Sequence, residues 1–491
     1  EMKRKIRVMS LFIVVVMIAS LFSACGDTGS PESEGTVELT WWHWGNAPSN
    51  ADAAMKALNE KSQKDIGVTI EFIWASTDDS RLKTALSTGT KDDIAFTCAW
   101  FTNYLSAVQN NQFADITELV KAQKELWDFV PDWGWDAVTV NDKIYAVPNM
   151  KDSASEQLWI ANKDYVIEEA GLEKEFFETN DKVSSVTPLL RKLKAYADAG
   201  HPYPADLSAP YNIGKGGFNG DQTGWDIIQE AVHIGDKIDE EGIKIVSVYE
   251  DPDQVAVYKE LATWYKEGLL NQDCAQLADD PDDFVVISYP GWEGSEAIRS
   301  EGKDYDVVIN KKYGPVATRS TVLGSANAVF ANSEHKEAAV KYLAYINTNK
   351  EYRDMLAYGA PDVNFKYIDD GARVEILNND FQPSAFAQAT TWILTPAAPS
   401  PASMYQDVQE MSESATPTEL ISFTLDESQL STQIAACSGV LAQYTSGLLC
   451  GTYEDVDAVI EKMLSELKAS GYDTIIEEAN RQVQEYLDER K

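Results

Sequence analysis

The sequence predicts an α/β protein with two lobes, preceded by an N-terminal segment that is not part of the fold. Three observations lead to this prediction. Strands and helices alternate at the start of the body, which favours a largely parallel sheet. The chain has 491 residues, whereas a single hydrophobic core rarely grows beyond about 250–300 residues. Its hydrophobic content of 44% is that of a well-packed globular protein.

Residues 1–24 have the layout of a secretory signal. Four basic residues precede a short apolar run from Leu11 to Ile18, and small residues follow in Ser23-Ala24-Cys25. The apolar run is short for a membrane span, and no later stretch is long enough either. One interpretation is an ordinary signal peptide cleaved at a small residue, with Cys25 incidental.

The residues before Cys25 favour a second interpretation. Leu21-Phe22-Ser23-Ala24 directly before a cysteine resembles the lipobox of bacterial lipoproteins. The resemblance implies that the Cys25 thiol is acylated and becomes the new N-terminus. Residues 25–35 are small and polar, with nothing to bury, so they are expected to form a flexible linker.

The body of the chain reads as strands separated by helices. Apolar residues alternate with polar ones from Val37 to Trp41 and again from Val68 to Trp74, and a short buried strand follows at Asp93–Phe96. Helices are expected between these strands, the first one capped by Ser49 or Asn50. Further strands are predicted at 243–248, 284–288 and 306–309, and helices after Ser333, at 456–467 and from about Thr474.

Charge and cysteine usage exclude several functions. The chain carries 79 acidic and 41 basic residues, a formal charge of −38, which repels polyphosphates and argues against nucleic-acid partners and acidic ligands. Besides Cys25 there are four cysteines, an even number that permits disulfides in an exported chain: Cys98, Cys274, Cys437 and Cys450. Whether Cys437 and Cys450 pair is left open. No CxxC pair is present, so no structural zinc is expected, and no cofactor is expected either.

Four segments, in this order, resemble the solute-binding proteins of bacterial sugar importers: Asp93–Phe96 with Gln112–Thr117, Asn141–Pro148, Val286–Trp292 and Gly324–Ile346. The resemblance implies a two-lobe, periplasmic-binding-protein-like fold of type II, with hinge crossovers and a helical C-terminal region. It divides the chain into an N-lobe of 36–147 and 316–350 and a C-lobe of 148–315 and 351–491.

The resemblance also implies the function. The protein is expected to be the lipid-anchored substrate-binding component of an ABC importer, held on the extracellular face of the cytoplasmic membrane of a Gram-positive bacterium through its lipid anchor alone. It would bind an oligosaccharide between its lobes, close like a hinge and dock on the permease subunits, without catalysis.

Candidate ligand contacts are aromatic and polar residues near predicted strand ends, because sugar rings stack on flat aromatics and their hydroxyls need polar partners. The strongest candidate is Trp292, which a Pro-Gly break is expected to display, with Glu293 beside it. The others are Trp44, Asn46, Trp100, Asn103 and Asp152; Trp133, Trp135, Trp225 and Trp392 are weaker. Core packing is the competing interpretation for each tryptophan, and His43 is expected to be structural.

Three alternatives stay open. A secreted enzyme acting on polysaccharide would need two neighbouring carboxylates, and nothing in the sequence selects such a pair. Neither HExxH nor GxSxG is present. A receptor of the same fold could bind a peptide or another solute, or could serve a sensor kinase. The glycine-rich stretch 214–220 and the acidic stretch 279–283 are interpreted as a loop and a solvated turn.

Overall fold

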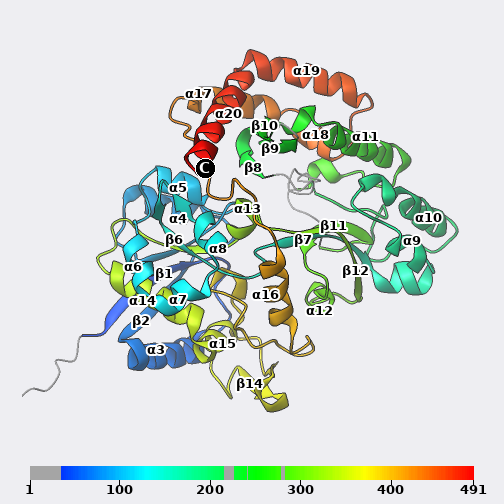
Figure 1. Ribbon diagram of the computed structural model, residues 1–491. Coiled ribbons are helices and arrows are strands. Elements are labelled where there is room, and N and C mark those ends of the chain that lie inside the picture. Colours follow the sequence, from blue (N-terminus) through cyan, green and yellow to red (C-terminus); the bar gives the residue numbers. More distant parts are fainter. Residues whose placement is uncertain (1–34, 215–225, 240–241, 278–281, 491) are drawn as a thin grey trace, which may run out of the picture. The chain divides into compact units, whose positions relative to one another are not determined.

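The computed structural model describes residues 35–214, 226–239, 242–277 and 282–490 (Figure 1). Several sequence-based predictions therefore lie outside the described residues. They are the signal peptide, the lipidation site Cys25, nearly all of the linker, Trp225, most of the 214–220 loop and part of the 279–283 turn.

The first sheet has five strands in the order β2-β1-β3-β13-β6. Its three leading strands are parallel, as their separation by helices predicted, and β13 lies antiparallel between β3 and β6. The chain thus leaves this sheet after β6 and returns almost 180 residues later, when β13 inserts between β3 and β6. The strands are β1 (Val37–His43), β2 (Val68–Trp74), β3 (Ile94–Thr97), β6 (Ala146–Pro148) and β13 (Ala326–Val329).

Helices cover this sheet because their apolar faces complete its core. Leu39 and Trp41 on β1 have no exposed surface, and Leu58 on α3 and Tyr342 on α14 belong to the same buried cluster. The helix α3 begins at Asp52, slightly later than the predicted cap at Ser49 or Asn50. The helices of this lobe are α3 (Asp52–Ile66), α4 (Ser80–Thr88), α5 (Tyr104–Gln109), α6 (Thr117–Ala122), α7 (Lys124–Phe129), α8 (Asp132–Ala137), α14 (Lys336–Thr348) and α15 (Lys350–Tyr358), with a small hairpin of β4 (Thr139–Val140) and β5 (Lys143–Ile144).

The second sheet is antiparallel, with β7 in the middle of the order β11-β7-β12. Trp159 on β7 and Trp264 on α11 lie fully buried in its core. The predicted strands at 284–288 and 306–309 are confirmed, with different ends. The elements are β7 (Ser155–Asn162), β11 (Val286–Gly291), β12 (Val307–Val316), α9 (Glu173–Phe177), α10 (Thr187–Asp198), α11 (Pro252–Glu267), α12 (Glu296–Arg299) and α13 (Arg319–Val322).

The C-terminal helices pack on a third, small sheet, the antiparallel meander β10-β9-β8. Figure 1 shows the helices α17 to α20, in orange to red, beside these strands. Val232, Ile234 and Tyr249 share one buried cluster with Met463 and Tyr472. The predicted C-terminal helices are confirmed, and Gly471, at φ 94°, makes the turn between α19 and α20. The elements are β8 (Ile227–Gln229), β9 (Ile234–Asp239), β10 (Gly242–Ser247), α17 (Ser431–Leu441), α18 (Thr445–Leu449), α19 (Val456–Ala469) and α20 (Tyr472–Glu489).

A disulfide fastens the end of α18 to the second lobe. Cys450 directly follows α18 and pairs with Cys274, with a Cα–Cα distance of 5.7 Å across a sequence separation of 176 residues. Cys437, the partner left open by the sequence, is a buried free thiol, as is Cys98. Gly451, the residue after Cys450, has φ 65° and packs so tightly that a Cβ atom would overlap the backbone carbonyl of Leu261 on α11. The end of α18 is therefore fixed to the second lobe by a covalent bond at Cys274 and to α11 by close backbone contact at Leu261.

The segment from Tyr352 to Val408 packs with the first sheet. Tyr352, Phe365 and Trp392 lie in the same buried cluster as β1. This segment contains β14 (Phe365–Ile368) and β15 (Arg373–Ile376), and α16 (Met404–Ser414) closes it. The predicted division at residue 350, which gave this segment to the C-lobe, stays a prediction, and the shared cluster favours a boundary after Val408.

Candidate functional site

Three aromatic rings form a platform at the carboxyl end of the first sheet. The ring centroids of Trp44 and Trp100 are 5.6 Å apart, and that of Phe386 lies 5.2 Å from Trp44 and 6.2 Å from Trp100. Trp44 follows β1 and Trp100 follows β3. The parallel strands β1 and β3 end at the same edge of the sheet, where open α/β sheets bind ligands.

Trp100 is the member of this platform that offers a free face. Its side chain is 55% exposed, although its indole Nε1 donates a hydrogen bond of 3.0 Å to the Gly324 carbonyl. Trp44 is half-buried, and its own Nε1 is buried without a hydrogen-bond partner among the described residues. A fixed, exposed indole suits stacking on a flat ligand because little conformational freedom is lost on binding.

Two adjoining cavities, together called the cleft here, lie beside this platform. They measure about 290 and 310 Å³ and share the residues Ala99, Ile227, Glu230 and Ser320. Trp100 and Asn103 line the cleft from the first lobe, and further lining residues come from the meander and from the chain between 420 and 449. Cavities of this size match the lower range of small-molecule sites.

The two candidate asparagines lie differently. The Asn103 side chain caps α5, where its Oδ1 accepts a 3.0 Å bond from the Ser106 amide, and its Nδ2 donates to the Ala99 carbonyl at 3.1 Å. Asn46 is exposed and lines neither cavity. The roles of both residues in binding stay predictions.

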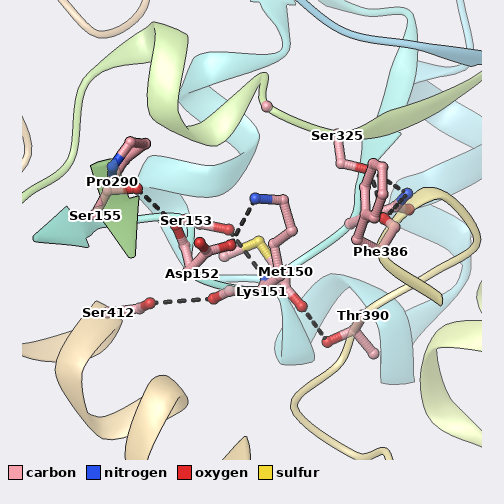
Figure 2. A network of polar contacts seen from close by, with 12 residues as sticks. Met150, Lys151, Asp152, Ser153, Ser155, Pro290, Ser325, Phe386, Thr390 and Ser412 are labelled. Carbon is pink, nitrogen blue, oxygen red and sulfur yellow. Dashed lines mark hydrogen bonds and ion pairs between the residues drawn. The ribbon is translucent and has the colours of Figure 1, made fainter. Parts of the chain in front are cut away.

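The first crossover between the lobes runs beside the platform and is held by main-chain acceptors (Figure 2). The Met150 carbonyl accepts a 2.7 Å bond from Thr390, and the Lys151 carbonyl accepts a 3.2 Å bond from Ser412. The segment 390–412 therefore supports this crossover from a distant part of the chain.

Asp152 belongs to this crossover rather than to the cleft lining. Its carboxylate accepts a 2.6 Å bond from the Lys151 ammonium, and Figure 2 shows the two side chains turned toward each other. Burial acts to raise the pKa of Asp152, but the Lys151 ammonium outweighs this effect and leaves the pKa below its ordinary value. The predicted ligand contact through Asp152 stays a prediction.

The second crossover carries a residue that sequence reasoning missed. Arg319 on α13 is 6% exposed and donates to the carbonyls of Ala137 and Thr139 at 3.0 and 2.8 Å. On its other side it donates to the Phe423 carbonyl and the Thr424 hydroxyl, both at 2.5 Å. Burial lowers the pKa of Arg319 to about 10, so it stays charged at neutral pH. Three of its acceptors are main-chain carbonyls and the fourth is a single threonine hydroxyl. Because main-chain groups leave no trace in the sequence, no motif indicated that Arg319 would hold this crossover.

Trp292 lies away from the cleft cavities. Its ring is half-buried against the core of the first lobe, because β11 runs through the Pro290-Gly291 step that was expected to break it. Glu293 forms an ion pair of 2.9 Å with Lys311. Ligand contacts through Trp292 and Glu293 stay predictions.

Two of the weaker tryptophan candidates are scaffold. Trp135 is 4% exposed and stacks on Trp127, with ring centroids 4.9 Å apart. Trp392 is 5% exposed and donates to the Lys151 carbonyl at 2.8 Å. Trp133 is half-buried against the buried cluster of the first lobe.

His43 is structural, as expected, and makes the stability of the fold depend on pH. The fully buried ring packs on Trp74 and bonds the Trp44 carbonyl through Nδ1 at 2.6 Å. Burial lowers its pKa from 6.5 to about 4, so between these values the unfolded chain binds a proton that the folded protein does not. We expect His43 to remove about 3 kcal/mol of the free energy of unfolding as the pH falls from 6.5 to 4.

Urea unfolding at pH 4.5 and pH 7 measures this effect. The difference between the two pH values should shrink in His43→Phe. The exposed His201 serves as control, since His201→Phe should behave as the wild type. An unchanged pH dependence in His43→Phe would contradict the assignment.

The geometry defines a two-lobe solute-binding fold with an aromatic cleft, and comparison with known proteins agrees. A carbohydrate ABC transporter substrate-binding protein of Streptococcus pneumoniae serotype 4 (strain ATCC BAA-334 / TIGR4) is 24% identical over 97% of both chains. Residues 419–488 match a family model described only as a domain of unknown function, DUF3502.

Solved structures share the fold. The N-glycan transport solute-binding protein NgtS of Streptococcus pneumoniae superposes with a TM-score of 0.82 at 23% identity, over 93% of this chain and 100% of the other. NgtS in complex with Man5GlcNAc gives 0.75, over 93% and 99% of the two chains, again at 23% identity. A human-milk-oligosaccharide-binding solute-binding protein of Bifidobacterium longum infantis gives 0.58 at 13% identity, over 92% and 99%.

These likenesses confirm the predicted fold class and the predicted resemblance to sugar solute-binding proteins of ABC importers. Among the described residues, every helix is too short or too polar to cross a bilayer.

Proposed function

We propose that this protein is the lipid-anchored substrate-binding component of an ABC importer and that it binds an oligosaccharide in the cleft between its lobes. The single observation that carries the proposal is the exposed face of Trp100, which is fixed by its bond to Gly324 and lines the cleft. Sugar rings expose C–H faces that stack on such an indole.

The charges of the cleft favour an uncharged sugar. Asp226, Glu230 and Glu427 line it, whereas Arg319, the one arginine among its described lining residues, is bonded to four protein acceptors. Carboxylates accept hydrogen bonds from sugar hydroxyls and repel uronates or sialic acids. Its relative NgtS has been crystallised with Man1GlcNAc and Man5GlcNAc, so these neutral glycans are the first ligands to try.

The predicted N-terminus and the fold support the lipid anchor, the contact with the permease and the absence of catalysis in this proposal. Acylation of Cys25 would tether the protein to the extracellular face of the membrane, and the linker would let it reach the permease subunits. The cleft would bind and release its ligand unchanged, without catalysis.

The test is calorimetric titration of the lipid-free protein, residues 36–491, with a panel of glycans headed by Man1GlcNAc and Man5GlcNAc, alongside peptides and alginate oligomers. We expect binding to a neutral glycan and at least a tenfold loss of affinity in Trp100→Ala, because a central stacking aromatic contributes about 2 kcal/mol or more. Phe177→Ala, a 49%-exposed aromatic that lines neither cavity, is the control and should bind as the wild type.

Binding of peptides without binding of any glycan would refute the carbohydrate assignment. Conversion of a glycan to products during prolonged incubation would favour the enzyme alternative instead.

A further inference from the structure

The C-terminal region of unknown function contributes lining residues to both cavities of the cleft. In the larger cavity, Thr445 and Leu449 on α18 line the same space as Trp100 and Ala99. In the smaller one, Leu420, Phe423 and Glu427, close to the start of the region, are part of the lining. Residues between 420 and 449 therefore border both cavities.

The polar groups of this lining are arranged as hydrogen-bond partners. The ring nitrogen Nδ1 of His233 bonds the hydroxyl of Tyr249, and both side chains line the larger cavity. Thr445 donates its hydroxyl hydrogen in a 2.8 Å bond to the Leu441 carbonyl, and its hydroxyl also hydrogen-bonds the Tyr249 side chain, which leaves Oγ1 one lone pair able to accept a bond from a ligand. Ile227, Val248 and Leu449 add apolar lining, and Glu230 and Ser320 add further polar groups.

The position of α18 is fixed by contacts of the two residues that follow it. Cys450, one residue past α18, is bonded to Cys274, and Gly451 packs on the backbone of α11. A wall that must hold a hydrogen-bonding group within a few tenths of an ångström of a ligand needs this kind of support.

We propose that residues 419–488 are a working part of the ligand site, in which Thr445, together with Tyr249 of the adjoining meander, binds the hydroxyls of an uncharged sugar unit stacked on Trp100. The proposal rests on the proposed function, and it assigns a role to a region whose family is described as having none known. It makes the sugar unit bridge the first lobe and the C-terminal helices.

Thr445→Val tests the proposal because valine keeps the shape of threonine and removes its hydroxyl. We expect about a tenfold loss of affinity for the glycan that the wild type binds, with Man5GlcNAc tried first, since a ligand hydroxyl would be left unpaired in the closed cleft. The control is Ser446→Ala, the next residue on the same helix, which lines neither cavity and should bind as the wild type. Thermal unfolding of each variant confirms that the fold is intact.

A second measurement needs no variant. Hydrogen exchange of the backbone amides from 441 to 452 should slow when Man5GlcNAc is added, because the ligand would rest on α18. If Thr445→Val binds normally and these amides keep their exchange rates, while Trp100→Ala still abolishes binding, the wall assignment is overturned and the proposed function survives. If the wild type binds no glycan of the panel, both fall.

Discussion

Replacing Arg319 with alanine is expected to lower the free energy of unfolding by about 4 kcal/mol. The change leaves the carbonyls of Ala137, Thr139 and Phe423 buried without their donor, and each such group costs about 1–3 kcal/mol. It also empties the space of a large side chain at the second crossover. Arg319→Lys should recover little, because an ammonium cannot reproduce the planar fork that reaches acceptors on two sides.

Denaturant unfolding followed by tryptophan fluorescence measures this loss. The matched control is Arg191→Ala, because Arg191 is an exposed arginine with a bidentate ion pair to Glu267, and such pairs contribute at most about 1 kcal/mol. Equal losses in the two variants would show that Arg319 does not hold the crossover together.

Removing the Cys274–Cys450 disulfide is expected to cost about 3–5 kcal/mol. Its large sequence separation of 176 residues means that the bond strongly restricts the unfolded chain. The double variant Cys274→Ala/Cys450→Ala should melt well below the wild type, and reducing agent should lower the melting temperature of the wild type toward that of the variant.

Cys437→Ala is the control for this experiment. It removes a buried thiol that is in no disulfide, so its melting temperature should still fall on reduction by as much as that of the wild type. A wild type that melts at the same temperature with and without reducing agent would contradict the expected contribution of the bond.

Local patterns predicted the parts of the fold that depend on local physics. The alternation from Val37 to Trp41 correctly predicted β1, and the helical spacing from 456 to 467 correctly predicted α19. Both patterns were readable because the apolar residues on one side of each element pack against a hydrophobic core. The same patterns do not say which core a helix joins. The helix α15 packs with the first sheet through Tyr352 and Leu356, a choice made by contacts far apart in sequence.

In the candidate site, too, local patterns predicted some residues, whereas residues placed by long-range contacts were missed. Trp44 and Trp100 were found because strand ends can be recognised, and the structure brings these two rings together. The pairing of Cys274 with Cys450 and the clamp around Arg319 could not be read from spacing, since their partners lie more than 100 residues away or are main-chain groups. The cleft lining from the C-terminal region was missed for the same reason, because no motif marks Thr445.

The clamp around Arg319 has an evolutionary consequence. Three of its four acceptors are main-chain carbonyls, which every amino acid provides. Substitutions at positions 137, 139 and 423 therefore preserve the contact as long as the backbone keeps its course. Among descendants of this sequence, selection should hold the arginine constant while the residues that receive its hydrogen bonds drift, a pattern that a search for co-varying side-chain pairs would overlook.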